Sequence, residues 1–337
     1  MEQSKAKSTK VFITGATGLL GANTARVLIE RGHSLKVLVR KSSNLKALEG
    51  VDAELCYGDV TDRDSIIRAL NGCKYAVHSA ALVSMWPGHS KQMEEINVGG
   101  TKNFLDACKA YGNLEKIVHV STVDAIGMRS RENPSDETVP WDYSQYKNAY
   151  ALTKKKAQDV ALRYASEGLP VVIVNPTYMF GAHDTKPSSG QMIIEVVRKR
   201  ARFYTTGGNS LVDVLDVANG IANALESGKP GERYILANDK YNLTYKEIFE
   251  LIANVTKSPK PIAPIPKPFA LIGGLLLDQM SRISNKPSQL SSASAFMGYQ
   301  PHYFTSKKAQ REINLPQSPV ERAIERAYKW FKENGYL

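Results

Sequence analysis

The chain has 337 residues, with 44 Lys and Arg against 33 Asp and Glu, so its formal net charge is +11. Apolar residues make up 42% and charged residues 23%, which excludes a disordered, collagen-like or coiled-coil protein. The length allows one large domain or two, and either can bury a full core. Three scattered cysteines have neither disulfide-framework nor zinc-site spacing, so we expect a reducing, cytoplasmic location (Cys56, Cys73 and Cys108).

The sequence predicts neither an export signal nor a transmembrane segment. Residues 1–10 are polar, and the short apolar run after them is interrupted at once by Thr14 and Gly15, unlike a signal peptide. The longest apolar run, residues 269–277, contains two glycines and falls short of the roughly 20 residues that span a bilayer. We interpret residues 269–280 as a helix of a substrate-binding lobe, with an interfacial anchor as the alternative.

The positive charge by itself does not indicate a nucleic-acid partner. The densest basic cluster, residues 198–202, is typical of the solvated end of a helix. It is not accompanied by a zinc finger, a helix-turn-helix signature or interleaved aromatic residues. The six histidines show no metal-ligand spacing, so we expect no metal site either.

Short β-branched runs alternate with helical stretches through the first half of the chain. In order, we predict strand 10–14, helix 21–31, strand 35–39, strand 51–57, helix 62–70, strand 75–79, helix 93–111, strand 116–120, helix 144–167 and strand 171–175. This alternation predicts an α/β protein with a Rossmann-like, doubly wound parallel sheet. Ligands of such sheets bind beyond the carboxyl ends of the strands.

The alternation becomes irregular after Pro176. Residues 177–210 and 239–337 mix Pro, Ser and apolar stretches, and we interpret them as a smaller mixed lobe that frames a substrate cleft. Residues 1–176 are then the dinucleotide-binding domain, and residues 211–238 are expected to return to it.

A glycine-rich loop lies between the first predicted strand and the first helix. Gly15 permits a tight turn, Gly18 lets the backbone approach a pyrophosphate, and Gly21 allows the helix to pack closely on the strand. The phosphates would lie at the N-terminus of the helix, where free N–H groups attract anions. The loop lacks the Gly-Lys-Ser/Thr ending of a P-loop. Its seven residues are Gly15, Ala16, Thr17, Gly18, Leu19, Leu20 and Gly21.

The end of the second strand indicates which dinucleotide binds. NAD-binding proteins place an acidic residue there, about 20 residues beyond the loop, whereas this chain has Arg40 followed by Lys41. A guanidinium can hold the 2′-phosphate of NADP through paired charge-assisted hydrogen bonds. We therefore predict NADP(H) as cofactor, with NAD(H) as the alternative.

Several short motifs then follow in a fixed order. They are Gly58-Asp59-Val60, His78-Ser79-Ala80-Ala81, Asn97-Val98-Gly99-Gly100-Thr101, Ser121-Thr122 through Gly127, Tyr150-Ala151-Leu152-Thr153-Lys154 and Asn175-Pro176. On these motifs the chain resembles the extended short-chain dehydrogenase/reductase superfamily of NAD-dependent epimerases and dehydratases, over about residues 10–240. Ala80-Ala81-Leu82-Val83, Trp86-Pro87, residues 212–218 and Gly231-Glu232-Arg233-Tyr234 resemble its dihydroflavonol-reductase-like branch, which includes hydroxysteroid- and farnesol-dehydrogenase-like enzymes.

The resemblance implies further cofactor contacts. Asp59 and Val60 would contact the adenine, and Pro176 would flank the nicotinamide. Ala80 and Ala81 would line the cofactor. The superfamily also implies homodimers, although these residues do not themselves indicate one.

The resemblance also implies a catalytic set, which the chemistry of the side chains supports. A free tyrosine has a pKa of about 10, and a nearby lysine ammonium lowers it by favouring the phenolate. Tyr150 and Lys154, one helical turn apart, can both face the cofactor. Thr122 would donate a hydrogen bond to the substrate oxygen, and Asn97 would hold a water that relays protons to Lys154.

A second pair, Tyr143 and Lys147, has the same spacing of four residues. The positions 143, 147, 150 and 154 would all lie on one face of the predicted helix, so spacing alone does not choose between the pairs. Thr153 matches the small hydroxyl residue that precedes the lysine in the superfamily, which favours Tyr150. Tyr143 is then a tyrosine of the cleft or the surface.

These features predict an NADP(H)-dependent oxidoreductase that interconverts a carbonyl and an alcohol on a fairly apolar small molecule. The alternative is an NDP-sugar epimerase or dehydratase with tightly bound NAD. Two departures count against that alternative: Asn175-Pro176 replaces the Arg-Pro of many sugar-nucleotide enzymes, and Ile126-Gly127 replaces the usual Tyr-Gly. A non-enzymatic dinucleotide sensor would commonly lack the Tyr/Lys pair.

Overall fold

A computed structural model describes residues 9–284 and 291–337. Its centre is a seven-stranded sheet in which all neighbouring strands run parallel. In spatial order the strands are β3 (Glu54–Tyr57), β2 (Ser34–Val39), β1 (Lys10–Thr14), β4 (Tyr75–His78), β5 (Lys116–Val120), β6 (Val171–Pro176) and β10 (Arg233–Leu236). This order confirms the predicted doubly wound α/β fold. Strands β1 to β3 extend the sheet in one direction, and the strands from β4 onward extend it in the other direction from β1.

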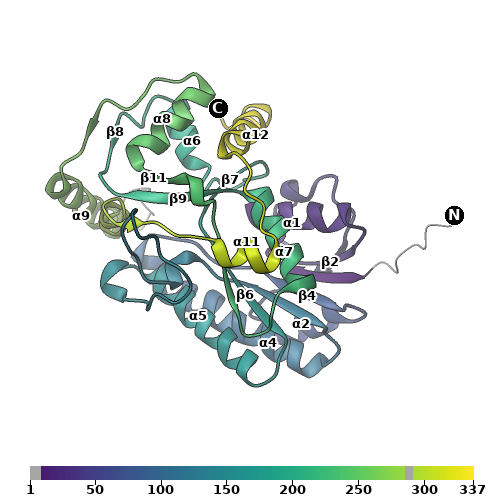
Figure 1. The fold of residues 1–337 in the computed structure, drawn as a ribbon. Coiled ribbons are helices and arrows are strands. Elements are labelled where there is room, and N and C mark those ends of the chain that lie inside the picture. The colour runs from purple at the N-terminus through teal and green to yellow at the C-terminus, as the bar shows by residue number, and fades with distance from the viewer. Residues whose placement is uncertain (1–8, 285–290) are drawn as a thin grey trace.

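Helices cover both faces of this sheet (Figure 1), because its central strands are buried and apolar on both sides. Along β1, Val11 and Ile13 pack into one core and Phe12 into the other, as the alternation of side chains in a strand requires. On one face lie α1 (Leu19–Glu30) and α7 (Val214–Ser227), and on the other lie α2 (Arg63–Leu70), α4 (Gly100–Tyr111) and α5 (Ala149–Ser166).

Two of the predicted helices differ from the observed ones. The predicted helix 93–111 is divided into α3 (Ser90–Met93), a π-helical turn at Glu94–Gly99, and α4. The predicted helix 144–167 begins only at Ala149, because Lys147 has a left-handed φ of 49° and the Asn148 side chain caps the helix by accepting from Ala151 N–H. The expectation that residues 143, 147, 150 and 154 share one helical face was therefore wrong.

A smaller lobe is built on β9 (Gly208–Asp213). Around β9 lie β7 (Tyr178–Phe180), β11 (Asn242–Thr244) and β13 (Pro301–His302), so the small sheet combines segments that are far apart in the chain. Its core is closed by α6 (Gln191–Val197), α8 (Tyr245–Thr256) and α12 (Val320–Glu333). The short helix α11 (Lys307–Ile313) instead packs on α7 and β10 of the large sheet, although its sequence position lies within the expected smaller lobe.

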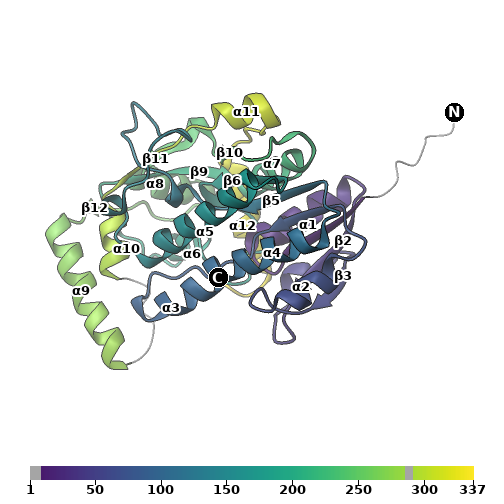
Figure 2. The ribbon, with the colours of Figure 1, turned by 90° about the horizontal axis from the view of Figure 1, so that it is seen from below.

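One end of the smaller lobe protrudes from the rest of the molecule (Figure 2). It consists of the strand pair β8 (Phe203–Tyr204) and β12 (Ala263–Pro264), followed by α9 (Lys267–Ser284) and α10 (Ser292–Met297). Single 3-10 turns elsewhere cover Lys46–Leu48, Pro87–His89, Val123–Ala125, Tyr143–Gln145 and Asp239–Tyr241. Residues 1–8, on which the expectation of no signal peptide partly rests, lie outside the described residues.

Candidate active site

The glycine-rich loop joins β1 to α1 at the carboxyl edge of the large sheet. Gly15 has a φ of +76°, and a Cβ there would lie 2.6 Å from the carbonyl carbon of Ser79 and the nitrogen of Ala80. A Cβ on Gly21 would overlap the carbonyl oxygen of Gly15. Both positions therefore require glycine, Gly15 because of its φ and its contact with the residues after β4, Gly21 because the helix packs on the loop.

The first turn of α1 is prepared to bind an anion. Within the described residues, the backbone N–H groups of Leu19, Leu20 and Gly21 have no hydrogen-bond partner, and no side chain caps the helix. Gly18 is exposed, and a Cβ there would meet only the carbonyl oxygen of Gly15, at 3.5 Å. Thr17 lies partly exposed beside it. This open cradle of N–H groups fits the pyrophosphate of a dinucleotide.

The residues that follow β2 and β3 lie further along the same edge. Arg40 directly follows β2 and is exposed, and within the described part of the chain its guanidinium forms neither an ion pair nor a hydrogen bond. Asp59 accepts hydrogen bonds from the backbone and the hydroxyl of Thr61. Val60 is buried against Gly100. Arg40, Asp59 and Val60 therefore lie where the adenosine half of a dinucleotide would be placed if its pyrophosphate bound at the N-terminus of α1.

Ala80 and Ala81 follow β4, and the next residue is fixed by Asn97. The Asn97 side chain accepts from Leu82 N–H at 2.7 Å and donates to Leu82 C=O at 3.0 Å. It also donates to the Thr153 hydroxyl at 3.1 Å, which in turn donates to the Tyr150 carbonyl oxygen. Asn97 lies in the π-helical turn, an irregularity frequently found at functional sites. It thereby ties the loop after β4 to α5.

Thr122 and Tyr150 meet at the end of β5. The Thr122 side chain lies beside the Tyr150 hydroxyl and favours its phenolate form, which lowers the pKa of Tyr150. Thr122 also accepts from Asp124 N–H at 3.2 Å, and its carbonyl oxygen accepts from Asn175 Nδ2 at 2.6 Å, just before Pro176 at the end of β6. Burial raises the pKa of Tyr150, as does the nearby Asp124 carboxylate. Without a cofactor the phenol therefore stays protonated, as a proton donor should.

Lys154 lies one turn along α5 from Tyr150 and is buried. Its ammonium donates to the carbonyl oxygen of Val120 at 2.8 Å, two residues before Thr122. Burial lowers the pKa of Lys154 to about 8, although the Asp124 carboxylate opposes this change. The structure thus brings Thr122, Tyr150 and Lys154 together from two different elements.

Two buried histidines lie behind Lys154 but are not suited to proton transfer. His78 and His119 are paired across β4 and β5. Burial and the Lys154 charge lower the pKa of His78 to about 3 and lower that of His119 as well. Both rings are therefore neutral, and His78 is held between the hydroxyls of Thr14 and Thr101.

The second Tyr/Lys pair lies apart from this arrangement. Tyr143 is 44% exposed in a 3-10 turn, and Lys147 is exposed before α5 begins. The Lys147 ammonium lies 4.9 Å from the ring centre of Phe296. The four-residue spacing of this pair therefore does not correspond to one turn of a helix.

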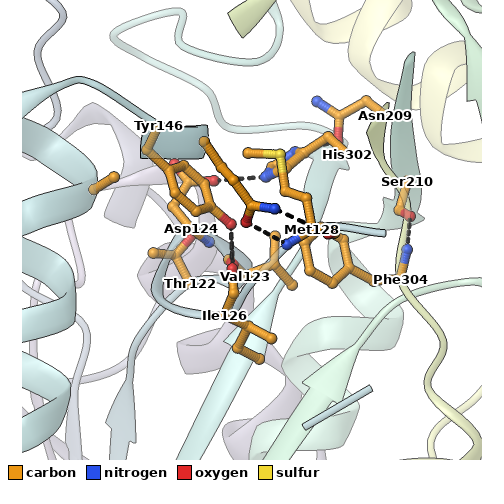
Figure 3. Close-up of polar contacts among 12 residues, drawn as sticks. Thr122, Val123, Asp124, Ile126, Met128, Tyr146, Asn209, Ser210, His302 and Phe304 are labelled. Carbon is orange, nitrogen blue, oxygen red and sulfur yellow. Dashed lines mark hydrogen bonds and ion pairs between the residues drawn. The ribbon is translucent and has the colours of Figure 1, made fainter. Parts of the chain in front are cut away.

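The structure also reveals a buried polar contact that the sequence analysis missed (Figure 3). The Asp124 carboxylate lies 2.9 Å from Nε2 of His302, and both side chains are buried. Nδ1 of His302 lies 3.1 Å from the Asn209 side-chain oxygen. Asp124 could have been noticed as an acid inside the motif from Thr122 to Gly127. His302 follows a segment without periodicity, and no pattern links it to the site.

The comparisons with known proteins agree with this geometry. The profile of the NAD dependent epimerase/dehydratase family matches residues 11–237. A candidate dihydroflavonol 4-reductase of Synechocystis sp. is 33% identical over 97% of this chain and 95% of its own length. Sterol demethylase protein B of Methylococcus capsulatus is 30% identical over 97% and 99%. The crystal structure of gox2253 superposes with a TM-score of 0.86, at 34% identity over 98% and 100% of the two chains.

The family match covers the glycine loop, the motif around Thr122 and the Tyr150–Lys154 helix, all within residues 11–237. It supports a nicotinamide dinucleotide as cofactor and an NAD(P)-dependent oxidoreductase as the class of enzyme. The chain belongs to the NAD-dependent epimerase/dehydratase family of extended short-chain dehydrogenase/reductases, and its relatives assign it to the dihydroflavonol-reductase-like branch.

Proposed function

We propose that the protein is an NADP(H)-dependent oxidoreductase that interconverts a carbonyl and an alcohol on a fairly apolar small molecule. The observation that carries the proposal is the contact between the Thr122 and Tyr150 hydroxyls, with the Lys154 ammonium buried one turn away. This set combines a proton donor, a second hydroxyl for the same oxygen and a cation that tunes the donor.

The side chains have separate roles in reduction. The nicotinamide, when bound, supplies the hydride to the carbonyl carbon. Tyr150 gives its phenolic proton to the carbonyl oxygen, so that hydride and proton together reduce C=O to an alcohol. Thr122 donates a hydrogen bond to the same oxygen and holds it beside Tyr150. Lys154 stabilises the phenolate left behind and thereby lowers the pKa of Tyr150 at the moment of transfer. In oxidation each of these proton movements runs in reverse.

Asn97 completes the proposed set by holding the residues that position Lys154. Its amide N–H groups are both used, by Leu82 and Thr153, whereas its oxygen accepts only from Leu82 N–H and keeps one lone pair. A water bound to that lone pair would relay a proton toward Lys154. In this proposal Asn97 acts through Lys154 and through the position of α5, without touching the substrate.

The preference for NADP(H) is proposed on the basis of Arg40. Its side chain is exposed and unpaired among the described residues, directly after the strand whose end contacts the adenosine ribose in this fold. Asp59 is already engaged by Thr61, and no carboxylate follows β2 directly. NAD(H) remains the alternative cofactor.

The names of two relatives support the proposed substrate class. Two relatives carry names that refer to ring compounds, a dihydroflavonol 4-reductase and a sterol demethylase protein B. The alternative substrate class is an NDP-sugar, because the family includes epimerases and dehydratases. That alternative would require tightly bound NAD and a hydride that returns to the same molecule.

A pair of variants tests the proposal. NADPH oxidation is followed with a panel of apolar ketones and aldehydes, using wild type, Tyr150→Phe and the matched control Tyr143→Phe. We expect Tyr150→Phe to lower kcat at least about 100-fold, because it removes the proton donor, while Tyr143→Phe stays near wild type. A Tyr150→Phe enzyme with near-normal turnover, or a loss confined to Tyr143→Phe, would contradict the assignment.

A further inference from the structure

The outward face of α9 is apolar, the reverse of an ordinary surface helix. Six of its side chains, Phe269, Ile272, Leu275, Leu276, Met280 and Ile283, are between 56% and 86% exposed. Five of them follow the spacing of three or four residues that places side chains on one helical face (269, 272, 276, 280 and 283). A surface helix normally turns such a stripe toward the core.

The opposite face of α9 is the one that packs on the protein. A Cβ on Gly274 would lie 2.8 Å from the backbone of Ser292, so α9 and α10 approach closely there. One turn further along, the buried Asp278 accepts hydrogen bonds from the backbone and the hydroxyl of Ser292. Because a close backbone contact and a carboxylate hold this face, the helix cannot simply rotate its apolar stripe inward.

Two more exposed apolar side chains lie at the same end of the molecule. Ile262, next to β12, is 61% exposed, and Phe203, in the paired strand β8, is 53% exposed. Strand β12 leads directly into α9 (Figure 2). We call the six α9 residues together with Phe203 and Ile262 the apolar surface. A gathering of exposed apolar side chains of this kind is typical of an interaction site.

The chain around the apolar surface is strongly basic. Residues 198–204 and 257–284 contain eight Lys and Arg but one acidic residue, Asp278, whose carboxylate is buried against Ser292. These segments carry a net charge of +7, most of the +11 of the whole chain. Among the described side chains, Arg202, Lys257 and Lys260 are exposed and form no ion pair.

We propose that the apolar surface docks on an anionic lipid bilayer, with α9 lying in the plane of the headgroups. The apolar side chains would enter the boundary with the acyl chains, and the surrounding cations would contact lipid phosphates and carboxylates. Within the described residues, no helix is long and apolar enough to cross a membrane, so this contact is peripheral. A contact between two copies through this surface would bring two sets of like charges together, which opposes it.

The surface lies close to the catalytic helix. A pocket of about 250 Å³ is lined by Leu271 and Leu275 of α9, by Phe296 of α10 and by Lys147, which stands just before α5. The proposed function has an apolar substrate, and an apolar compound dissolves in the bilayer. A bilayer contact at α9 would then hold the candidate active site close to that substrate. Vesicle binding itself does not depend on that function, so the two proposals can fail separately.

The test is co-flotation of the full-length protein with vesicles of phosphatidylcholine alone and of phosphatidylcholine mixed with phosphatidylserine. We expect binding to the mixed vesicles that weakens at high salt. Leu276→Ser combined with Met280→Ser should weaken it at least about tenfold, because exposed apolar area is lost. Lys257→Gln combined with Lys260→Gln should weaken binding to the mixed vesicles by up to about 30-fold. The matched control, Leu55→Ser with Tyr57→Ser on exposed β3, should bind like wild type.

Hydrogen exchange of the wild type with and without mixed vesicles supplies a readout that needs no variant. Protection confined to peptides of α9 and β12 would support the proposal. Absence of binding to both vesicle types, or unchanged binding by the Leu276/Met280 variant, would overturn it. It would also be overturned if ultracentrifugation showed a dimer that this variant dissociates, because the apolar surface would then be a contact between copies.

Discussion

The Asp124 carboxylate and the His302 imidazole meet at 2.9 Å in the protein interior, between the loop after β5 and the smaller lobe. Asp124 is two residues from Thr122, and its charge acts on the pKa of both Tyr150 and Lys154. His302 belongs to β13, beside Asn209 of β9. One buried contact therefore joins the loop that carries Thr122 to the smaller lobe (Figure 3).

Removing the Asp124 charge should shift the pH dependence of reduction. The wild-type kcat/KM for reduction should fall above about pH 8, where Lys154 loses its proton. Because the Asp124 carboxylate raises the pKa of Lys154 and of Tyr150, Asp124→Asn should lower both values and move this break to lower pH. The measurement is the pH profile of kcat/KM. Asp142→Asn, an exposed acid that only caps the 3-10 turn before α5, serves as control, and an unmoved or raised break in Asp124→Asn would refute the coupling.

Replacing Lys154 should remove activity yet stabilise the fold near neutral pH. Its pKa is about 8 in the folded protein, below the ordinary value near 10.5, so burial of the charged form costs stability at pH 7. Lys154→Met should therefore unfold at a free energy about 1–3 kcal/mol higher than wild type, allowing for the lost hydrogen bond to Val120.

The sign of the pH dependence follows from the same pKa. Between about pH 8 and 10.5 the unfolded chain keeps the Lys154 proton and the folded chain does not, so wild-type stability rises and the advantage of Lys154→Met shrinks. Urea unfolding at several pH values measures this difference. Lys147→Met, at an exposed lysine, should show no such trend, and a Lys154→Met protein less stable than wild type at pH 7 would contradict the account.

Arg40→Ala should weaken NADPH binding while leaving NADH binding nearly unchanged. A charge-assisted hydrogen bond contributes about 1.5–3 kcal/mol, so the Kd for NADPH should rise about 10- to 100-fold. Titration of nicotinamide fluorescence measures both constants in one preparation, and NADH is the internal control. Equal losses for the two dinucleotides would mean that Arg40 supports the loop and does not select the 2′-phosphate.

Comparing Gly15→Ala with Gly32→Ala distinguishes the free energy lost to an unfavourable φ from that lost to steric overlap of the added Cβ. Both have positive φ, 76° and 85°, but a Cβ on Gly32 meets nothing within 4 Å, whereas one on Gly15 meets Ser79 and Ala80 at 2.6 Å. Gly32→Ala should lower the free energy of unfolding by about 1–2 kcal/mol. Gly15→Ala should lower it further and also weaken dinucleotide binding. Equal losses, with unaltered cofactor affinity, would show that the β1–α1 turn relaxes around the added methyl group.

The large sheet was predictable from sequence because its central strands are apolar on both faces and helical stretches separate them. Val11, Phe12 and Ile13 form such a run, and all three are fully buried. The start of α5 was not predictable in the same way, because the break depends on the left-handed conformation of Lys147 and the cap of Asn148. Periodicity continues smoothly through both residues, so the helix was extended too far.

The same difference between local and distant signals applies to the candidate site. Thr122, Tyr150 and Lys154 lie in local motifs with a fixed place in the fold, and their roles stay predictions until they are tested. The His302 contact joins residues 178 positions apart in sequence, and such a pairing leaves no local signal. The exposure of α9 was equally hidden, because an apolar run such as residues 269–277 does not say which of its faces packs.

The most direct test of the account is mass spectrometry of any dinucleotide released when the purified protein is denatured, combined with NADPH and NADH titrations of the remaining empty protein. We predict an empty or readily exchanged site that prefers NADPH, as a reductase that releases its oxidised cofactor requires. A stoichiometric, non-exchanging NAD⁺ would contradict both the role of Arg40 and the reductase assignment, and it would favour an epimerase or dehydratase.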